Sequence, residues 1–169
     1  SAASDVYKRQ EELVFQMMTY ARESNVFVAA DCQISSQTGD LKKFRNVDFM
    51  SPTEHEIRAT LMDNVGGIGI LTRRLQREMR IKNLFATLGA DGLLAQEYDV
   101  LQLDGDHESY YLPAIDCKIG DVTGAGDSLL VTSALALKSG AKTSEAALLG
   151  AIAATFQVAK QGNAPITMH

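Results

Sequence analysis

The chain has 169 residues, of which 46% are hydrophobic and 22% are charged, and it contains 13 glycines, 3 prolines and no tryptophan. This composition is typical of a globular domain with a sizeable core, and it excludes disordered and collagen-like chains. Sixteen Lys and Arg residues against 21 Asp and Glu residues give a net charge of −5, which excludes the broad basic surface that duplex nucleic acid or an anionic membrane requires. An anionic ligand must therefore be held by a local arrangement of donors.

The sequence also indicates the cellular compartment in which the protein works. Cys32 and Cys117 lie far apart without a CxxC spacing, so neither a disulfide framework nor a zinc cluster is predicted. No apolar run reaches the roughly 18 residues of a membrane span, and no secretory signal opens the sequence. We therefore expect a cytoplasmic protein without a membrane or nucleic-acid partner. Residues 1–10 have the character of a cloning or assembly remnant, so the domain is taken as residues 11–169.

Buried strands alternate with helices through the first half of the chain. Apolar residues at helical spacing predict the helices, and short β-rich or apolar runs predict strands that precede a helix or a glycine-rich turn. The predicted helices are 11–23, 53–62 and 66–79, and the predicted strands are 26–30, 47–50 and 83–88. The polar residues 35–43 predict a loop, and the Met17-Met18 pair is expected in the core.

The second half begins with short strands that are expected to be antiparallel at one edge of the sheet: 93–97, 100–103 and 110–112. Two apolar helices then follow over 125–138 and 143–160, separated by Ser139-Gly140. Alternating buried strands and crossover helices are typical of an α/β layer fold with a mainly parallel sheet between helices. Ligands in such folds bind at the carboxyl ends of the strands.

The strongest local signal is a glycine-rich turn, Gly120-Asp121-Val122-Thr123-Gly124-Ala125-Gly126-Asp127-Ser128, which runs directly into an apolar helix. Small residues let a ligand approach the backbone, and the free N–H groups of a helix's first turn bind an anion such as phosphate. A carboxylate held there, such as that of Asp127, can take the proton of an attacking hydroxyl during phosphoryl transfer. From the turn alone, the alternative is a plain helix cap with acids at the positive end of the helix dipole.

Asp121 to Asp127 resemble the ATP-site signature of ribokinase-like (PfkB-type) carbohydrate kinases, and two further segments agree with that family in the expected order. Thr87-Leu88-Gly89-Ala90-Asp91-Gly92 resembles its Thr-Leu-Gly-x-x-Gly strand end, and Ser51-Pro52-Thr53-Glu54-His55-Glu56 is similar to its Pro-Asn-x-x-Glu element near magnesium. Residues 159–164 resemble the family's tail over the adenine and a monovalent-cation site. The resemblance covers residues 11–169, but only about the C-terminal half of a full family member.

The resemblance implies a three-layer ribokinase-like fold and ATP-dependent phosphorylation of a sugar or sugar-phosphate hydroxyl. It implies that Asp127 is the catalytic base and that the backbone N–H groups of Gly124, Ala125 and Gly126 form the anion hole for the transferred phosphoryl group. These roles fit a reaction that depends on positioning and charge stabilisation. The nucleotide-binding positions implied by the resemblance are Thr87, Gly89, Gly92, Gly124, Gly126 and Asn163.

Two cations are implied by the same resemblance. Glu56 acts on Mg²⁺ through water, which suits an ion that keeps most of its hydration shell. Asp121 and the backbone around Thr123 lie near a monovalent cation, for which K⁺ is the candidate. Thr53 stands where the family usually has Asn, and this departure puts the metal role of the element in question.

The family's sugar-contacting residues and its small β-lid come mostly from the N-terminal half, which this sequence lacks. We therefore expect the chain to expose a face that the missing half would cover, and a homodimer would form through the missing lid. Residues 31–43 together with Thr53 look closest to heptose-phosphate kinase-type members. Two alternatives stay open: a non-catalytic nucleotide-binding fragment or module of a larger bifunctional protein, and a family kinase acting on a nucleoside or vitamin-type alcohol.

Overall fold

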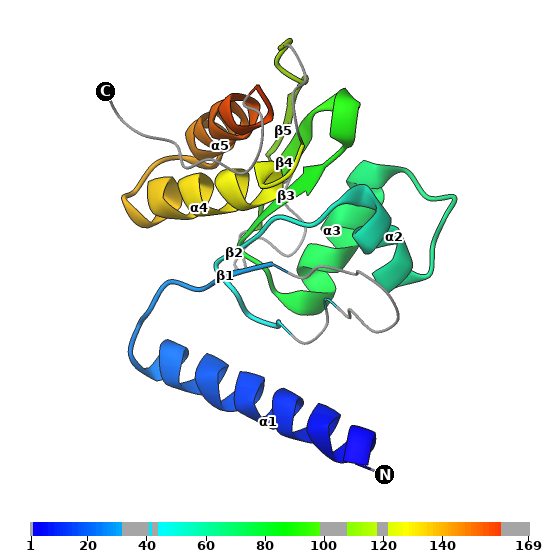
Figure 1. Ribbon diagram of the computed structural model, residues 1–169, viewed down its shortest axis with the longest axis vertical. Coiled ribbons are helices and arrows are strands. Elements are labelled where there is room, and N and C mark those ends of the chain that lie inside the picture. The colour runs from blue at the N-terminus through cyan, green and yellow to red at the C-terminus, as the bar shows by residue number, and fades with distance from the viewer. Residues whose placement is uncertain (1, 32–40, 42–43, 99–107, 118–121, 160–169) are drawn as a thin grey trace.

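The computed structural model describes residues 2–31, 41, 44–98, 108–117 and 122–159, with side chains described from residue 12 onward. Helices alternate with short strands along the described chain (Figure 1). In chain order the elements are α1 (Ala2–Glu23), β1 (Ala29–Ala30), β2 (Phe49–Met50), α2 (Glu54–Leu61), α3 (Ile68–Met79), β3 (Asn83–Thr87), the 3₁₀ turn η2 (Gly89–Asp91), β4 (Leu93–Glu97), β5 (Ser109–Leu112), α4 (Ala125–Lys138) and α5 (Thr143–Val158).

The strands form one five-stranded sheet in the order β1-β2-β3-β4-β5. β1 pairs with β2 and β2 with β3 in parallel, whereas β3 with β4 and β4 with β5 are antiparallel. The predicted antiparallel edge is therefore confirmed for 93–97 and 110–112, while the predicted strand 100–103 lies outside the described residues. The predicted strand 26–30 is shortened to Ala29–Ala30, because the Val28 amide donates to the Asp48 carboxylate at 2.8 Å instead of joining a backbone ladder.

Strand β3 lies between two hydrophobic clusters and supplies side chains to both. Leu84 and Ala86 belong to the cluster that contains apolar residues of α2 and α3, and Phe85 belongs to the cluster that contains residues of α4 and α5. This alternation follows from the two-residue period of a strand. Figure 1 accordingly shows α2 and α3 on one side of the sheet and α4 and α5 on the other. The predicted three-layer α/β fold is confirmed.

Helix α1 is longer than predicted, because it begins at Ala2 and not at Glu11. Residues 2–10 contain no glycine or proline, so nothing in them stops the helix. The helix lies apart from the sheet in Figure 1 and contacts the core through Met18, whereas Met17 is 61% exposed. The expectation that both methionines are buried was therefore wrong for Met17. The interpretation of residues 1–10 as a remnant stays a prediction.

Helices α4 and α5 carry large apolar side chains on faces that nothing in the described chain covers. We call the exposed residues the outer face: Val131, Leu135, Leu148, Leu149, Ile152 and Phe156, of which Leu135 is 64% and Phe156 60% exposed. These two helices therefore expose apolar surface, and the expectation that a missing half covers it stays a prediction. None of the helices in the described ranges is long and apolar enough to cross a bilayer.

The inner sides of α4 and α5 approach each other closely at Gly150. The Ser133 hydroxyl of α4 donates to the Ala146 carbonyl of α5 at 3.1 Å. A Cβ added to Gly150 would lie 2.1 Å from Ser133 Oγ and 3.1 Å from the Leu129 carbonyl oxygen. Glycine at this position therefore allows the two helices to pack against the sheet together.

We predict that Gly150→Ala lowers the free energy of unfolding by about 1–3 kcal/mol, because the added methyl overpacks the contact between the helices. The matched control is Gly69→Ala in α3, where a Cβ meets nothing within 4 Å. That control should be neutral or stabilising by up to about 1 kcal/mol, since alanine is the better helix former. Urea unfolding measures both, and equal effects of the two substitutions would contradict the packing argument.

Candidate active site

Two of the sequence motifs meet at the carboxyl ends of β2 and β3. These strands are parallel, so the residues that follow them lie at one edge of the sheet. The Thr87 amide donates to the Pro52 carbonyl at 2.9 Å, and Thr53 and Thr87 form a parallel β-bridge. The backbone therefore fixes the start of the Thr53–Glu56 element relative to the end of the Thr87–Gly92 strand.

Helix α2 begins at this junction with a capping box. The Glu56 amide donates to Thr53 Oγ1 at 3.2 Å, and the Thr53 amide donates to Glu56 Oε2 at 2.8 Å. Glu56 is only 9% exposed, so its carboxylate is held by the fold and does not swing freely in solvent. Asn and Thr are both good N-cap residues, so Thr53 is able to cap the helix at the position where the family usually has Asn.

The donor chemistry at this junction fits a hydrated Mg²⁺ ion. Among the described residues, no three His, Cys, Asp or Glu side chains gather into a metal cluster. Mg²⁺ retains several waters and needs only one or two carboxylates, which Glu56 can supply. Ser51 Oγ, at the end of β2, is buried and has no hydrogen-bond partner in the described part of the chain, so an ordered water is expected there. The metal assignment itself stays a prediction.

The two glycines of the Thr87–Gly92 segment have different surroundings. Gly89 has φ +61° and a Cβ there would meet nothing within 4 Å, so its surface is open to a ligand. Gly92 has φ +100°, and a Cβ there would lie 2.2 Å from the Leu112 carbonyl oxygen. Gly92 is therefore required for the approach of the turn to β5, and its role as a nucleotide contact stays a prediction.

Tyr111 contacts the η2 turn, and the sequence did not predict this contact. Its hydroxyl donates to the Asp91 carbonyl at 2.5 Å, although the side chain is 59% exposed. The contact fastens β5 to η2. Only the pairing of distant strands brings Tyr111 to the turn, and no local spacing in the sequence indicates it.

The glycine-rich turn forms the start of α4. Gly124 is the N-cap residue with φ 79°, and Asp127 lies exposed in the first helical turn. The Ala125 amide donates to the Val122 carbonyl at 3.3 Å, so one of the three amides expected in the anion hole already has an acceptor. A Cβ on Gly126 would meet nothing within 4 Å, which leaves the surface above this turn open. The positive end of the helix is thus accessible to an anion.

Helix α4 reaches the sheet from the face opposite α2. Its residue Leu129 belongs to the same cluster as Leu93, which pairs with Thr87 in the sheet. Thr123 is exposed just before the helix. Asp121 and Asn163, the other predicted cation and nucleotide positions, lie outside the described residues. The structure therefore joins two motifs directly and places the third on the other face of the same sheet.

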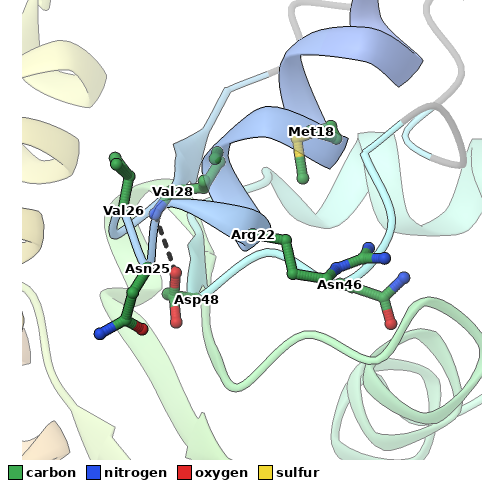
Figure 2. A pocket seen from close by; sticks show the side chains of 8 residues that line it. Met18, Arg22, Asn25, Val26, Val28, Asn46 and Asp48 are labelled. Atoms are coloured by element: carbon green, nitrogen blue, oxygen red, sulfur yellow. Dashed lines mark hydrogen bonds between the residues drawn. The ribbon is translucent and has the colours of Figure 1, made fainter.

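A cavity of about 140 Å³ lies elsewhere in the molecule, and Figure 2 shows residues that line it, among them Met18, Arg22, Asn25 and Asp48. Its lining residues Asn25, Val26 and Val28 precede β1, and Asn46 and Asp48 precede β2, so it lies at the amino ends of these strands. Asn25 and Asn46 have φ of 52° and 59°, a conformation that Asn tolerates in turns. The cavity is smaller than typical ligand pockets and is explained by two turns packed beside α1.

Comparison with known proteins decides the family. The sequence profile of the pfkB family carbohydrate kinases matches residues 4–167. The chain belongs to this family. It is 26% identical over 164 residues to the ribokinase of Lactococcus lactis, covering 91% of this chain and 50% of the relative. It is 28% identical over 136 residues to the bifunctional protein HldE of Trichlorobacter lovleyi, covering 79% of this chain and 26% of the relative.

Solved structures confirm the fold of this pfkB family chain. Phosphofructokinase-2 from Escherichia coli in complex with potassium matches with a TM-score of 0.76 at 18% identity, covering 90% of this chain and 48% of that chain. Arabidopsis thaliana ribokinase complexed with ribose and ATP matches with a TM-score of 0.73 at 20% identity, covering 90% and 47%. The chain therefore spans about half the length of these kinases, and the predicted ribokinase-like fold is confirmed.

We predict that Gly92→Ala destabilises the chain by about 2–4 kcal/mol, because it combines backbone strain at φ +100° with a backbone clash. Gly89→Ala is the matched control, since it has positive φ but open space. Its cost should be only about 1–2 kcal/mol, the penalty of a left-handed alanine. Chemical unfolding of both variants tests the difference, and a larger loss for Gly89→Ala would show that the close approach of Gly92 to β5 is not limiting.

Proposed function

We propose that this chain carries the ATP site and the catalytic base of an ATP-dependent carbohydrate kinase, a phosphotransferase acting on an alcohol group. The pairing of Pro52 and Thr53 with Thr87 is the observation that carries the proposal. It brings a held carboxylate, Glu56, and a glycine turn to one sheet edge in a chain of the pfkB family. The proposed acceptor is a sugar or sugar-phosphate hydroxyl, and the proposed location is the cytoplasm.

In the proposed reaction, Thr87, Gly89, Gly92 and Asn163 bind the nucleotide. The first-turn amides of Gly124, Ala125 and Gly126 face the transferred phosphoryl group and offset its negative charge. Asp127 accepts the proton of the acceptor hydroxyl while that oxygen bonds to the γ-phosphorus. The bond from the γ-phosphorus to the bridging oxygen breaks, and ADP leaves.

The proposed cofactors are ATP, Mg²⁺ and K⁺. The similar plant ribokinase was solved with ribose and ATP, and the similar E. coli phosphofructokinase-2 was solved with potassium, which supports the choice of ATP and a monovalent cation. Mg²⁺ bound through water to Glu56 would spread the phosphate charge. Asp121 and Thr123 are the proposed neighbours of K⁺.

A further part of a kinase domain is proposed to supply the acceptor site. Asp127, Val131 and Leu135 recur at four-residue spacing on one exposed side of α4, so the proposed base lies in line with the apolar outer face. A polypeptide covering this face would also reach Asp127. Because the chain covers 26% of a bifunctional relative, the second candidate is that it is a nucleotide-binding module within such a protein.

We predict that the chain by itself binds ATP in the presence of magnesium and that Asp127→Asn changes this affinity less than about two-fold. In the complete protein, meaning the natural polypeptide that contains this chain, the same substitution should lower the rate of sugar phosphorylation by at least about 100-fold, because a general base is lost. Glu78→Gln, an exposed carboxylate on α3, is the control. Calorimetry and a coupled ADP assay measure the two effects. Unchanged turnover in the Asp127→Asn protein contradicts the assignment, and binding without turnover in the complete protein favours the module.

We predict that the outer face is buried in the complete protein. In the isolated chain, Leu135→Ala should cost less than about 0.5 kcal/mol because Leu135 is 64% exposed. Leu129→Ala, at a site 5% exposed, should cost about 2–5 kcal/mol. In the complete protein the cost of Leu135→Ala should rise to about 2 kcal/mol or more. Unfolding experiments on both proteins decide this, and an equally small cost in both would mean that the outer face stays uncovered.

A further inference from the structure

Thr53 occupies the point where three segments of the proposed site meet. It follows the end of β2, caps the start of α2 and bridges to Thr87 at the end of β3. Its hydroxyl accepts from the Glu56 amide and its own amide donates to the Glu56 carboxylate. Thr53 itself is exposed, so it is not required to fill the core.

The capping box restricts the Glu56 side chain as well as the helix. A glutamate has three rotatable side-chain bonds, and an unrestrained carboxylate would lose part of its affinity for a bound cation to ordering. The 2.8 Å bond from the Thr53 amide to Oε2 fixes that carboxylate before any ligand binds. The Thr53–Thr87 bridge then sets its position relative to the strand end proposed to bind the nucleotide.

Helix α5 also starts with a capping box, in which the Lys142 amide donates to Glu145 Oε2 at 2.9 Å, but Glu145 is exposed whereas Glu56 is buried. The N-cap residues of α3 and α4 are Gly67 and Gly124, and neither helix has a side-chain cap. The box on α2 therefore coincides with the buried carboxylate of the candidate site. It joins the two motifs that lie at the carboxyl ends of β2 and β3.

We propose that Thr53 is a positioning residue that holds the Glu56 carboxylate for a cation-bound water and fixes it relative to the nucleotide at Thr87. The inference rests on the proposed function, because it concerns how Mg²⁺ and ATP are bound together. In this proposal, the Thr53 hydroxyl caps the start of α2, and the cap in turn orders the Glu56 carboxylate. Orientation of a ligand by its hydrogen-bonded neighbour commonly changes metal affinity.

The test compares two variants at Thr53 with a variant at Glu56 and with a control variant at Thr72 in α3. Thr53→Ala removes the cap, whereas Thr53→Ser keeps the hydroxyl and should rescue it. Glu56→Gln can keep the bond from the Thr53 amide but removes the charge. Thr72→Ala removes a buried hydroxyl of α3 that bonds to the Ile68 carbonyl, and it controls for loss of stability alone.

ATP affinity is measured by calorimetry with and without Mg²⁺, and hydrogen exchange is measured at the Thr87 amide. Thr53→Ala should weaken ATP binding about five-fold with Mg²⁺, the factor that corresponds to the loss of about 1 kcal/mol from a cap, and less than two-fold without it. It should also speed exchange at Thr87. Thr53→Ser and Thr72→Ala should leave both readouts near wild type, and Glu56→Gln should lose only the magnesium-dependent part.

The outcomes separate this inference from the proposed function. Equal Mg²⁺-dependent ATP binding by wild type and Thr53→Ala overturns the inference while the ATP site stands. An equal loss in Thr72→Ala overturns it as well, because stability alone would then explain the effect. If the wild-type chain and the complete protein do not bind ATP, the proposed function fails and the positioning role fails with it. Faster hydrogen exchange at the Thr87 amide of the Thr53→Ala variant would then show only that Thr53 stabilises the end of β3.

Discussion

The parallel alignment of β2 with β3 is the constraint on which the rest of the candidate site depends. It continues past the strands through the hydrogen bond from the Thr87 amide to the Pro52 carbonyl and through the Thr53–Thr87 bridge. Because of this alignment, α2 starts where β3 ends, and the buried Glu56 carboxylate lies at the edge of the sheet where ligands of α/β folds bind. A shift of one residue in this register would exchange the faces of Leu84 and Phe85 and would separate both clusters from their helices.

Helices α2 and α4 pack on opposite faces of the sheet. α2 packs on the cluster that contains Leu84, and α4 packs on the cluster that contains Phe85. Phe85 and Phe49 meet edge to face with ring centroids 4.7 Å apart, which helps to fix the second cluster under α4. The start of each helix carries one proposed acidic residue, Glu56 or Asp127. In the proposed function the start of α4 binds phosphate through backbone amides, which requires no basic surface and fits the net charge of −5.

Helices α4 and α5 differ between their inner sides, which face each other and the sheet, and the exposed outer face. The inner sides of these helices approach each other closely, since a Cβ on Gly150 would lie 2.1 Å from Ser133 Oγ. Their outer sides carry exposed Leu, Ile, Val and Phe side chains, an arrangement more typical of an interface than of a free surface. The chain spans about half of the ribokinase it matches, and the proposed covering segment would correspond to the other half.

The sequence by itself determined the succession of elements and the family. Hydrophobic period and glycine position predicted the helices 125–138 and 66–79 to within two residues, because both signals are local. The same local rules missed the start of α1 and the shortening of β1, which depends on the Asp48 carboxylate 20 residues away. Only the tertiary structure decided the bridge between Thr53 and Thr87, the difference between Gly89 and Gly92, and the contact of Tyr111 with Asp91. Each of these depends on which strand lies beside which, and strand pairing over long sequence separations leaves no periodic pattern in the chain.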